Sequence, residues 1–207
     1  MYLTRELATG IERAAKLFYP HRNPNNKVAR RAARKLHKLR ECPGLVQYIG
    51  HEHISIRRQQ IAVLISEYIS GSLLSTFLQQ QPGKRLQPFE ALHLLWSLSK
   101  ALEPIHSARE FHGDLHTANV LVERFGIGFR VKLIDIFEDD RNKVTSIHDD
   151  VVDLIKIFYE ATGGHARYRA HPPEIKNICK GLKRTLILEQ FRSAGQLARY
   201  LESMRWD

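Results

Sequence analysis

The chain has 207 residues, of which 43% are hydrophobic and 26% charged, so it can bury a core without a disulfide or metal. Only two cysteines are present, Cys42 and Cys179, which excludes a disulfide framework and favours a reducing compartment. No apolar run approaches the roughly 20 residues of a membrane-spanning helix, and the first residues lack the apolar core of a signal peptide. We therefore expect a cytoplasmic protein with no membrane partner.

Short apolar segments near the N-terminus predict strands over residues 11–19, 45–54 and 60–69. The Ala-Thr-Gly sequence at residues 8–10 predicts a hairpin turn before the first of them. A helix is predicted between the first two strands, at residues 27–40.

The formal net charge is +10, and it is densest at residues 27–40. Basic residues alternate there with alanine and leucine at helical spacing. This pattern fits the solvated face of an amphipathic helix, and it also fits a patch that meets an anionic partner such as a nucleic acid. Both interpretations stay open.

In the second half of the chain, apolar residues recur at the spacing of helices rather than of strands. Apolar residues recur every three or four positions over residues 92–105, which predicts a long helix with one core-facing stripe. Residues 149–159 predict a buried helix, and the two prolines and glutamate at residues 172–174 open another. Ser193 and Gln196 predict a capping box for a last helix.

The most informative stretches are residues 112–122, with the sequence HGDLHTANVLV, and residues 131–135, with the sequence VKLID. They place the carboxylate of Asp114, the amide of Asn119 five residues later, and the carboxylate of Asp135 after a short connection. In phosphoryl transfer one Asp orients the attacking hydroxyl, while an Asn and a second Asp hold magnesium against the phosphates of ATP. The spacing favours such a site.

This order of elements, with the three polar residues at the junction, resembles the protein-kinase superfamily over nearly the whole chain. The resemblance implies an α+β fold of two lobes in a single domain, residues 1–207. The small β-rich N-lobe, with one helix, would cover residues 1–67, and the larger, mainly helical C-lobe residues 68–207. It also implies ATP and Mg²⁺ as cofactors, with a hydroxyl on a protein serine or threonine, or on a small molecule, as the phosphate acceptor.

The resemblance also implies the roles of single residues. Asp114 would position the substrate hydroxyl and accept its proton. Asn119 and Asp135 would hold magnesium. Lys16 would pair with the α- and β-phosphates of ATP, and Asp150 would brace the catalytic loop from below.

The segment at residues 64–69 resembles the hinge between the lobes, whose backbone would meet adenine. The side chain of Ser66 would line the back of the nucleotide pocket. Glu67 and Ile69 would also contact the nucleotide cofactor. His116 joins these residues, because it stands where peptide kinases carry a lysine.

Two kinase features are missing near the N-terminus. No Gly-x-Gly-x-x-Gly loop precedes residues 2–5, which resemble the strand after that loop, and we hypothesise a misplaced start with glycine codons upstream of Met1. No acidic residue lies between residues 13 and 40, so Lys16 lacks the family's helix glutamate, and Glu41 is the nearest candidate downstream. These gaps motivate an alternative, a weak or inactive kinase-like protein that acts as a binding or scaffold partner.

The region after Asp135 departs from the family too. Ile136 and Phe137 replace the usual Phe-Gly, and residues 136–148 are too few for an activation loop. Gln190 stands where an arginine usually pairs with the end of that loop. The sequence His-Gly-Asp-Leu-His-x-x-Asn is similar to that of aminoglycoside and choline phosphotransferases, which keeps a small-molecule acceptor open.

Two histidine groups could also be read as metal sites. His112, Asp114 and His116 lack the further His or Cys that zinc sites normally use. His51 and His53 are too close in sequence to share a helix face, as a metalloprotease motif requires. Both readings are disfavoured.

Overall fold

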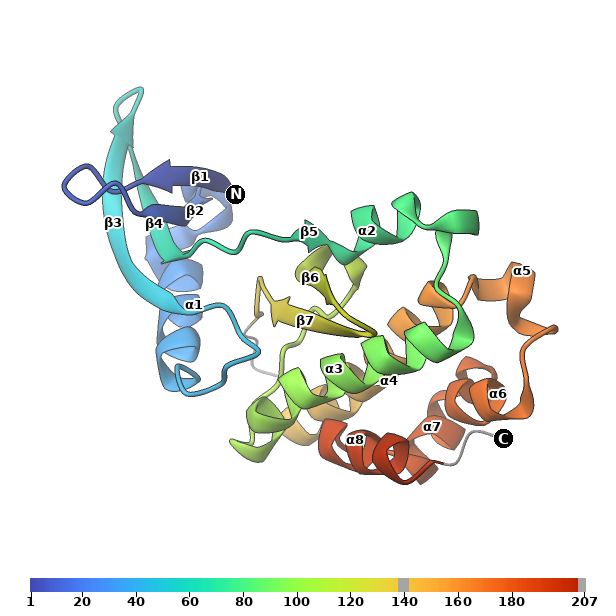
Figure 1. The fold of residues 1–207 in the computed structure, drawn as a ribbon. Helices are drawn as coiled ribbons and strands as arrows, with labels where there is room; N and C mark the ends of the chain where they lie inside the picture. The colour runs from blue at the N-terminus through green and yellow to red at the C-terminus, as the bar shows by residue number, and fades with distance from the viewer. Residues whose placement is uncertain (138–141, 205–207) are drawn as a thin grey trace. The chain divides into compact units, whose positions relative to one another are not determined.

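The computed structural model describes residues 1–137 and 142–204 (Figure 1). The chain divides into two compact units, Met1–Ser70 and Gly71–Asp207. The first unit contains an antiparallel sheet and the second is mainly helical, so the expected α+β class is confirmed. That the two units form one domain stays a prediction.

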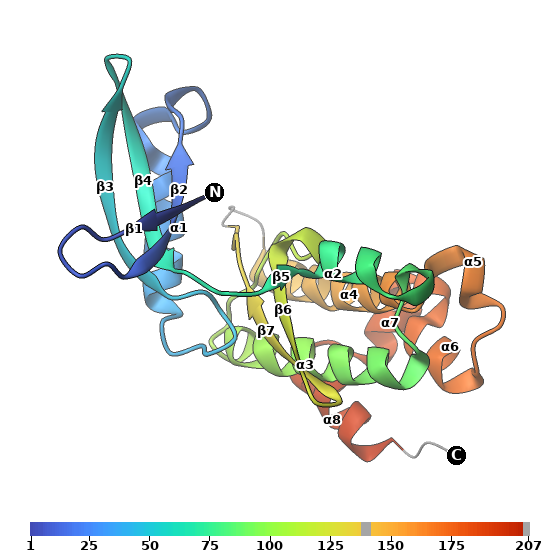
Figure 2. The same cartoon turned by 45° about the horizontal axis from the view of Figure 1, so that its top comes forward.

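The first unit is a four-stranded antiparallel sheet with the strand order β1-β2-β4-β3. Its elements are β1 (Tyr2–Arg5), β2 (Glu12–Phe18), α1 (Lys27–Lys38), β3 (Tyr48–Ile56) and β4 (Gln59–Glu67). Helix α1 packs against β3 and β4 on one side of this sheet (Figures 1 and 2).

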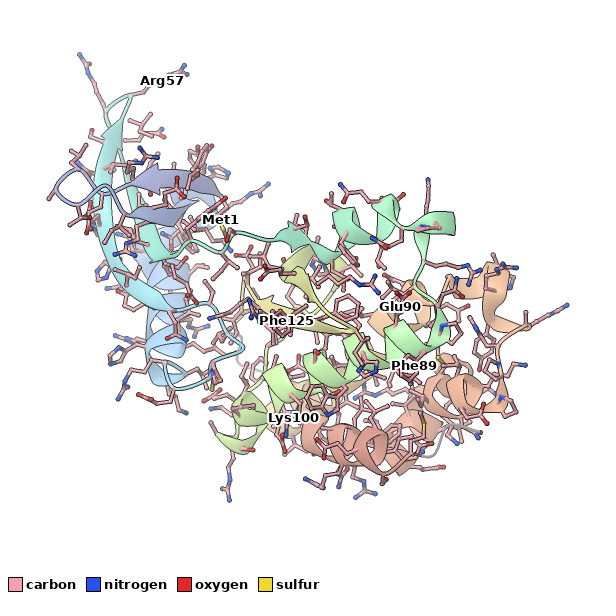
Figure 3. The ribbon with its side chains drawn as sticks, in the orientation of Figure 1. Met1, Arg57, Phe89, Glu90, Lys100 and Phe125 are labelled. Atoms are coloured by element: carbon pink, nitrogen blue, oxygen red, sulfur yellow. The ribbon has the colours of Figure 1, made fainter. Side chains whose placement is uncertain are left out.

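Both hairpins of this sheet close with residues of positive φ. The predicted turn at residues 8–10 is confirmed, because the Gly10 N–H donates to the Glu6 carbonyl at 2.8 Å and Gly10 has a φ of 72°. At the β3–β4 turn, Arg57 and Arg58 have φ values of 49° and 63°. Arg57 marks the end of that hairpin in Figure 3.

Strand β3 begins at Tyr48, three residues later than predicted. The side chain of Gln47 donates to the carbonyls of Cys42 (3.3 Å) and Leu45 (3.1 Å), which holds the preceding backbone in a loop. The Gln47 N–H donates to the Glu67 carboxylate at 2.9 Å, so the loop is tied to the end of β4.

The second unit combines a three-stranded antiparallel sheet, of order β5-β6-β7, with a set of helices. Its elements are β5 (Ser72–Leu73), α2 (Leu74–Gln80), α3 (Pro88–Ser107), β6 (Val120–Phe125), β7 (Gly128–Leu133), α4 (Lys143–Ala161), α5 (Gly164–Tyr168), α6 (Pro173–Cys179), α7 (Arg184–Gln190) and α8 (Ala194–Ser203).

Helices α3 and α4 form the core of this unit and pack against each other. The apolar stripe predicted on α3 is buried, with Leu95, Leu98 and Leu102 fully inaccessible to solvent. Helix α4 begins at Lys143, six residues earlier than predicted, because the Asn142 side chain accepts a hydrogen bond from the Val144 N–H at 2.9 Å. Within the described residues, none of the helices has both the length and the apolarity needed to cross a membrane.

The capping box predicted before α8 forms in part. The Ser193 hydroxyl accepts a hydrogen bond from the Gln196 N–H at 3.3 Å, as expected. The Gln196 side chain, however, accepts from the Arg192 N–H at 2.7 Å, one residue before the cap. Both bonds satisfy backbone donors at the start of the helix.

Candidate active site

The hairpin β6–β7 brings Asn119 and Asp135 to one end of a sheet. Its register pairs Val120 with Leu133, so the residues before β6 and after β7 are neighbours. The Ile134 N–H donates to the Asn119 carbonyl at 3.0 Å, and Asp135 follows directly. The two predicted magnesium ligands are therefore held together by backbone pairing.

Asn119 is also tied to Asp114. The short 3-10 turn Thr117–Asn119 leads the chain back, and the Asn119 side-chain nitrogen donates to the Asp114 carbonyl at 2.8 Å and to its carboxylate at 3.1 Å. Because both amide protons are used, the amide oxygen of Asn119 remains as an acceptor for a further ligand. Asn119 is only 7% exposed, whereas the Asp114 side chain is 56% exposed.

Asp135 has a φ of 59°, which is uncommon for a residue other than glycine and occurs preferentially at functional positions. Its neighbours Ile134 and Ile136 are both buried, and the Phe137 N–H donates to the His112 carbonyl at 2.8 Å. Packing on both sides thus maintains the unusual backbone. The Asp135 side chain itself is partly exposed.

The predicted brace by Asp150 is confirmed. Asp150 lies on α4, is fully buried, and accepts hydrogen bonds from the backbone N–H groups of His112 (2.6 Å) and Gly113 (2.8 Å). Gly113 has a φ of 86°, and a Cβ atom there would lie 2.9 Å from the ring of Phe111, so only glycine fits. The loop that carries Asp114 is thereby fixed from below.

His112 contributes to the same loop through hydrogen bonds. It is fully buried, and its Nε2 lies 2.9 Å from the Ile134 carbonyl, so Nε2 must carry the proton. Its Nδ1 then faces the Asp114 N–H at 3.4 Å. Within residues 1–137 and 142–204 no cluster of three His, Cys, Asp or Glu side chains is placed to hold a metal ion.

His106 is a site residue that the sequence did not indicate. Its Nε2 lies 3.1 Å from the Asp150 carboxylate, and its Nδ1 accepts a hydrogen bond from the Ala194 N–H at 3.1 Å. Because Nδ1 accepts, Nε2 carries the proton that bonds to Asp150. A chain of contacts thus links the start of α8, through α3 and α4, to the loop that carries Asp114.

His116 lies beside Asp114. Its Nδ1 accepts a hydrogen bond from the Ala118 N–H at 3.2 Å, which caps the 3-10 turn, and its Nε2 lies 3.7 Å from the Asp114 carboxylate. Both side chains are about half exposed. The imidazole of His116 therefore lies next to this carboxylate.

In the first unit, Lys16 and Ser66 lie on one face of the β2–β4 pair. The register pairs Lys16 with Leu64 and Ala14 with Ser66, and directly paired residues share a face. The Lys16 ammonium lies 5.5 Å from the ring of Phe18, and Ser66 is buried. Two of the predicted nucleotide contacts thus come together on this sheet.

The other two predicted hinge residues follow Ser66. Glu67 is the last residue of β4, and its carboxylate accepts the hydrogen bond from the Gln47 N–H. Ile69 lies beyond the strand and is partly exposed.

The family model for the protein kinase domain matches residues 1–138 of the 207. The chain belongs to the protein kinase family. No curated protein matches it. The kinase-like fold inferred from the sequence is thereby confirmed, while the roles of individual site residues stay predictions.

This member of the family lacks a helix glutamate in α1, and Glu41, the candidate substitute, lies beyond the end of that helix. Glu41 forms an ion pair with Arg40 at 3.4 Å, and its side chain is 87% exposed. Gln190, in place of the family's arginine, has a buried amide oxygen without a hydrogen-bond partner among the described residues. Of residues 136–148, which are too few for an activation loop, residues 138–141 lie outside the described residues, and residues from Lys143 onward belong to α4.

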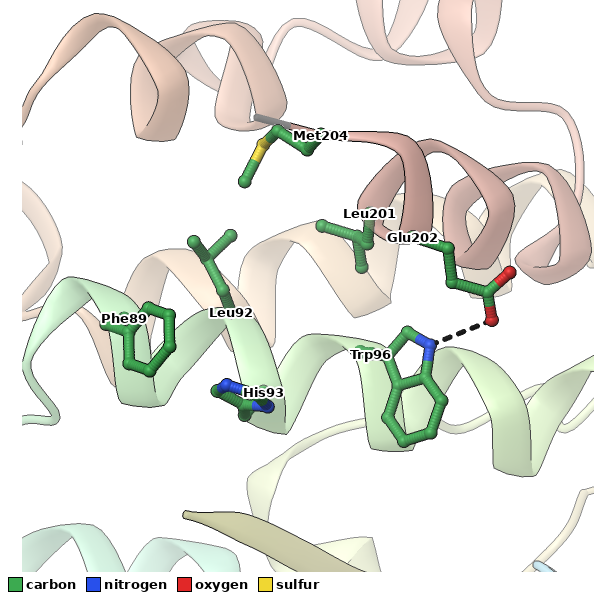
Figure 4. Close-up of a pocket in the computed structure, with 7 residues that line it drawn as sticks. All are labelled: Phe89, Leu92, His93, Trp96, Leu201, Glu202 and Met204. Atoms are coloured by element: carbon green, nitrogen blue, oxygen red, sulfur yellow. Dashed lines mark hydrogen bonds between the residues drawn. The ribbon is translucent and has the colours of Figure 1, made fainter. Parts of the chain in front are cut away.

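A separate pocket of about 370 Å³ lies between α3 and α8 (Figure 4). Its walls are mainly apolar and aromatic, and the Trp96 N–H donates to the Glu202 carboxylate at 3.0 Å across it. The lining residues are Phe89, Leu92, His93, Trp96, Leu201, Glu202 and Met204. None of the predicted site residues belongs to it.

Proposed function

We propose that this kinase transfers the γ-phosphoryl group of ATP, in the presence of Mg²⁺, to a hydroxyl group. The pair of hydrogen bonds from the Asn119 amide to Asp114 carries this proposal. These bonds orient the catalytic carboxylate and leave an amide oxygen available beside Asp135. A preorganised site of this kind needs little rearrangement during the reaction.

The donor set fits magnesium, which prefers carboxylate and amide oxygens. The Asp135 carboxylate and the Asn119 amide oxygen would hold the ion. When bound, the metal would supply positive charge to the phosphates. Lys16 would bind the α- and β-phosphates, and Ser66, with the backbone of Glu67 and Ile69, would receive the adenine end.

Asp114 would act on the acceptor hydroxyl. The hydroxyl oxygen forms a bond to the γ-phosphorus, the bond from that phosphorus to the β-phosphate oxygen breaks, and ADP leaves. The hydroxyl proton passes to the Asp114 carboxylate. Because the transition state is loose, positioning by Asn119 and by the brace at Asp150 would contribute most of the rate.

The acceptor that we propose first is a protein serine or threonine, and the second is a small hydroxylated molecule. The match to the protein kinase domain supports the first acceptor, whereas the short segment 136–142 between Asp135 and α4, and His116 in place of a lysine, support the second. Cys42 and Cys179 are both free thiols, which supports action in a reducing compartment such as the cytoplasm.

The test is ADP release from ATP and Mg²⁺, with a generic protein acceptor and with a panel of small alcohols. Asp114→Asn is expected to lower turnover by about 10²–10⁴-fold, as for loss of a general base. Asp153→Asn, which makes the same change at a partly exposed position of α4, should leave turnover unchanged. Full activity in Asp114→Asn would rule out the proposed role of Asp114.

A binding-only protein is the second candidate, because α1 offers Lys16 no carboxylate. The thermal shift on adding ATP, measured with and without Mg²⁺, separates the two candidates. A shift that requires Mg²⁺ and is lost in Asp135→Asn, without ADP release, would identify a pseudokinase.

A further inference from the structure

A pocket of about 440 Å³ lies in the first unit between α1 and the strands β3 and β4. Its floor is apolar and is made of small side chains, Ala29 and Ala33 from the helix and Ala62 from β4, with Leu64 beside them. Because the floor residues are short, space remains between helix and sheet that longer side chains would fill. The volume lies in the range of small-molecule sites, about 300–1,000 Å³.

The walls of this pocket carry arginine and histidine side chains. Arg30, Arg34 and His37 are spaced four and three residues apart, so they share one face of α1. His51 and His53 are alternate residues of β3 and pair with the floor residues of β4, so they project from the same side of the sheet. No Asp or Glu is among the described residues that line the pocket.

Neighbouring polar groups hold the two histidine rings of β3. The Tyr48 hydroxyl lies 2.9 Å from Nδ1 of His51, and the Asn26 amide nitrogen lies 3.2 Å from Nε2 of His53. The rings of His51 and His53 lie edge to face, with their centroids 6.4 Å apart. These contacts set the orientation of both rings in the wall of the pocket.

Among the described residues, no carboxylate pairs with the two arginines of the helix wall, Arg30 and Arg34. Helix α1 contains no acidic residue, and neither Arg30 nor Arg34 forms an ion pair with a carboxylate in the described part of the chain. The Arg30 guanidinium donates to the neutral Asn25 carbonyl at 2.6 Å. Like charges one turn apart destabilise a helix, so an anion bound here would relieve repulsion.

We propose that this pocket binds a small phosphorylated ligand. Two guanidinium groups one turn apart match the oxygens of a phosphate, with which arginine forms paired, charge-assisted hydrogen bonds. The body of the ligand would rest on the alanine floor between helix and sheet. The anionic partner expected at residues 27–40 thereby gains a defined site, and this site uses none of the residues assigned to phosphoryl transfer.

The experiment is a calorimetric titration of the full chain with inorganic pyrophosphate. EDTA is present to remove the divalent cation that the proposed nucleotide site requires. The test variant is Arg30→Gln with Arg34→Gln. Its matched control is Arg57→Gln with Arg58→Gln, which removes the same charge at the β3–β4 turn (Figure 3). Far-UV circular dichroism and the urea midpoint confirm that each variant is folded.

We expect pyrophosphate to bind the unmodified chain, the test variant to bind about tenfold or more weakly, and the control to bind within about twofold. The single change His51→Gln should also weaken pyrophosphate binding. This variant still tests the proposal if the double variant Arg30→Gln with Arg34→Gln does not fold. No binding, or equal weakening in test and control variants, would overturn the proposal. Preferential binding of an RNA oligonucleotide, equally sensitive to both arginine pairs, would overturn it as well.

Discussion

Replacing Asp150 tests how the loop that carries Asp114 is held in place. Its buried carboxylate accepts three hydrogen bonds, from the backbone N–H groups of His112 and Gly113 and from the ring of His106. Asp150→Ala leaves all three donors without a partner in the core. It also disconnects the loop of Asp114 from α4, so any activity should fall together with stability.

The magnitude follows from these three bonds. Hydrogen bonds to a charged group contribute about 1.5–3 kcal/mol each, which gives a gross loss of about 4.5–9 kcal/mol. Removing the carboxylate also removes the free-energy penalty of burying its charge, which offsets several kcal/mol. We therefore expect the free energy of unfolding to fall by about 3–5 kcal/mol, a large part of the roughly 5–15 kcal/mol of a typical domain.

The assay is urea unfolding followed by far-UV circular dichroism. Asp153→Asn is the matched control, because Asp153 lies on the same helix, is partly exposed, and pairs with Lys156 at 2.8 Å. Burial raises the pKa of Asp153, so loss of its charge is tolerated, and we expect a change below about 1 kcal/mol. A loss in Asp150→Ala no larger than in Asp153→Asn would refute the reasoning.

Three further predictions concern titratable groups. The hydrogen bond from Arg124 lowers the pKa of the Glu90 carboxyl. This contact therefore stabilises the fold above pH 4.5, and its contribution is lost as the pH falls through the lowered pKa. Glu90→Gln should lower the free energy of unfolding by about 1 kcal/mol at pH 7 and leave it unchanged in strong acid. Burial lowers the pKa of His171 below 6.5, so the unfolded chain binds the proton more readily and the protein should become less stable as the pH drops below 6.5. His171→Gln should remove this part of the pH dependence of the urea midpoint. A pH dependence of the midpoint that is unchanged in this variant would contradict the prediction. Burial raises the pKa of Cys179 to about 12 and also raises the pKa of Cys42. Neither thiol should therefore react with a disulfide reagent at pH 8 until urea is added. Fast reaction of the native protein with the reagent would contradict this prediction.

Most of the fold and of the candidate site could be predicted from short-range patterns in the sequence. The spacing from Asp114 to Asn119 and the apolar runs around Asp135 predicted that these residues form one site, and the structure places them on one loop and hairpin. The stripe on α3 and the turn at residues 8–10 were also predictable, because helical and strand periods depend on near neighbours. Short helices such as α5 were missed, since five residues hold too little periodic signal.

The sequence by itself determined the kinase-like order of elements and the set of polar residues at their junction. Only the tertiary structure decided how they are supported: His106 meets Asp150 across 44 positions and Ala194 across 88. The same holds for the pocket between α1 and β3, which needs a helix and a strand to pack together. Such contacts depend on the path of the whole chain, and no local period encodes them, because the free energy of packing comes from neighbours that the sequence separates.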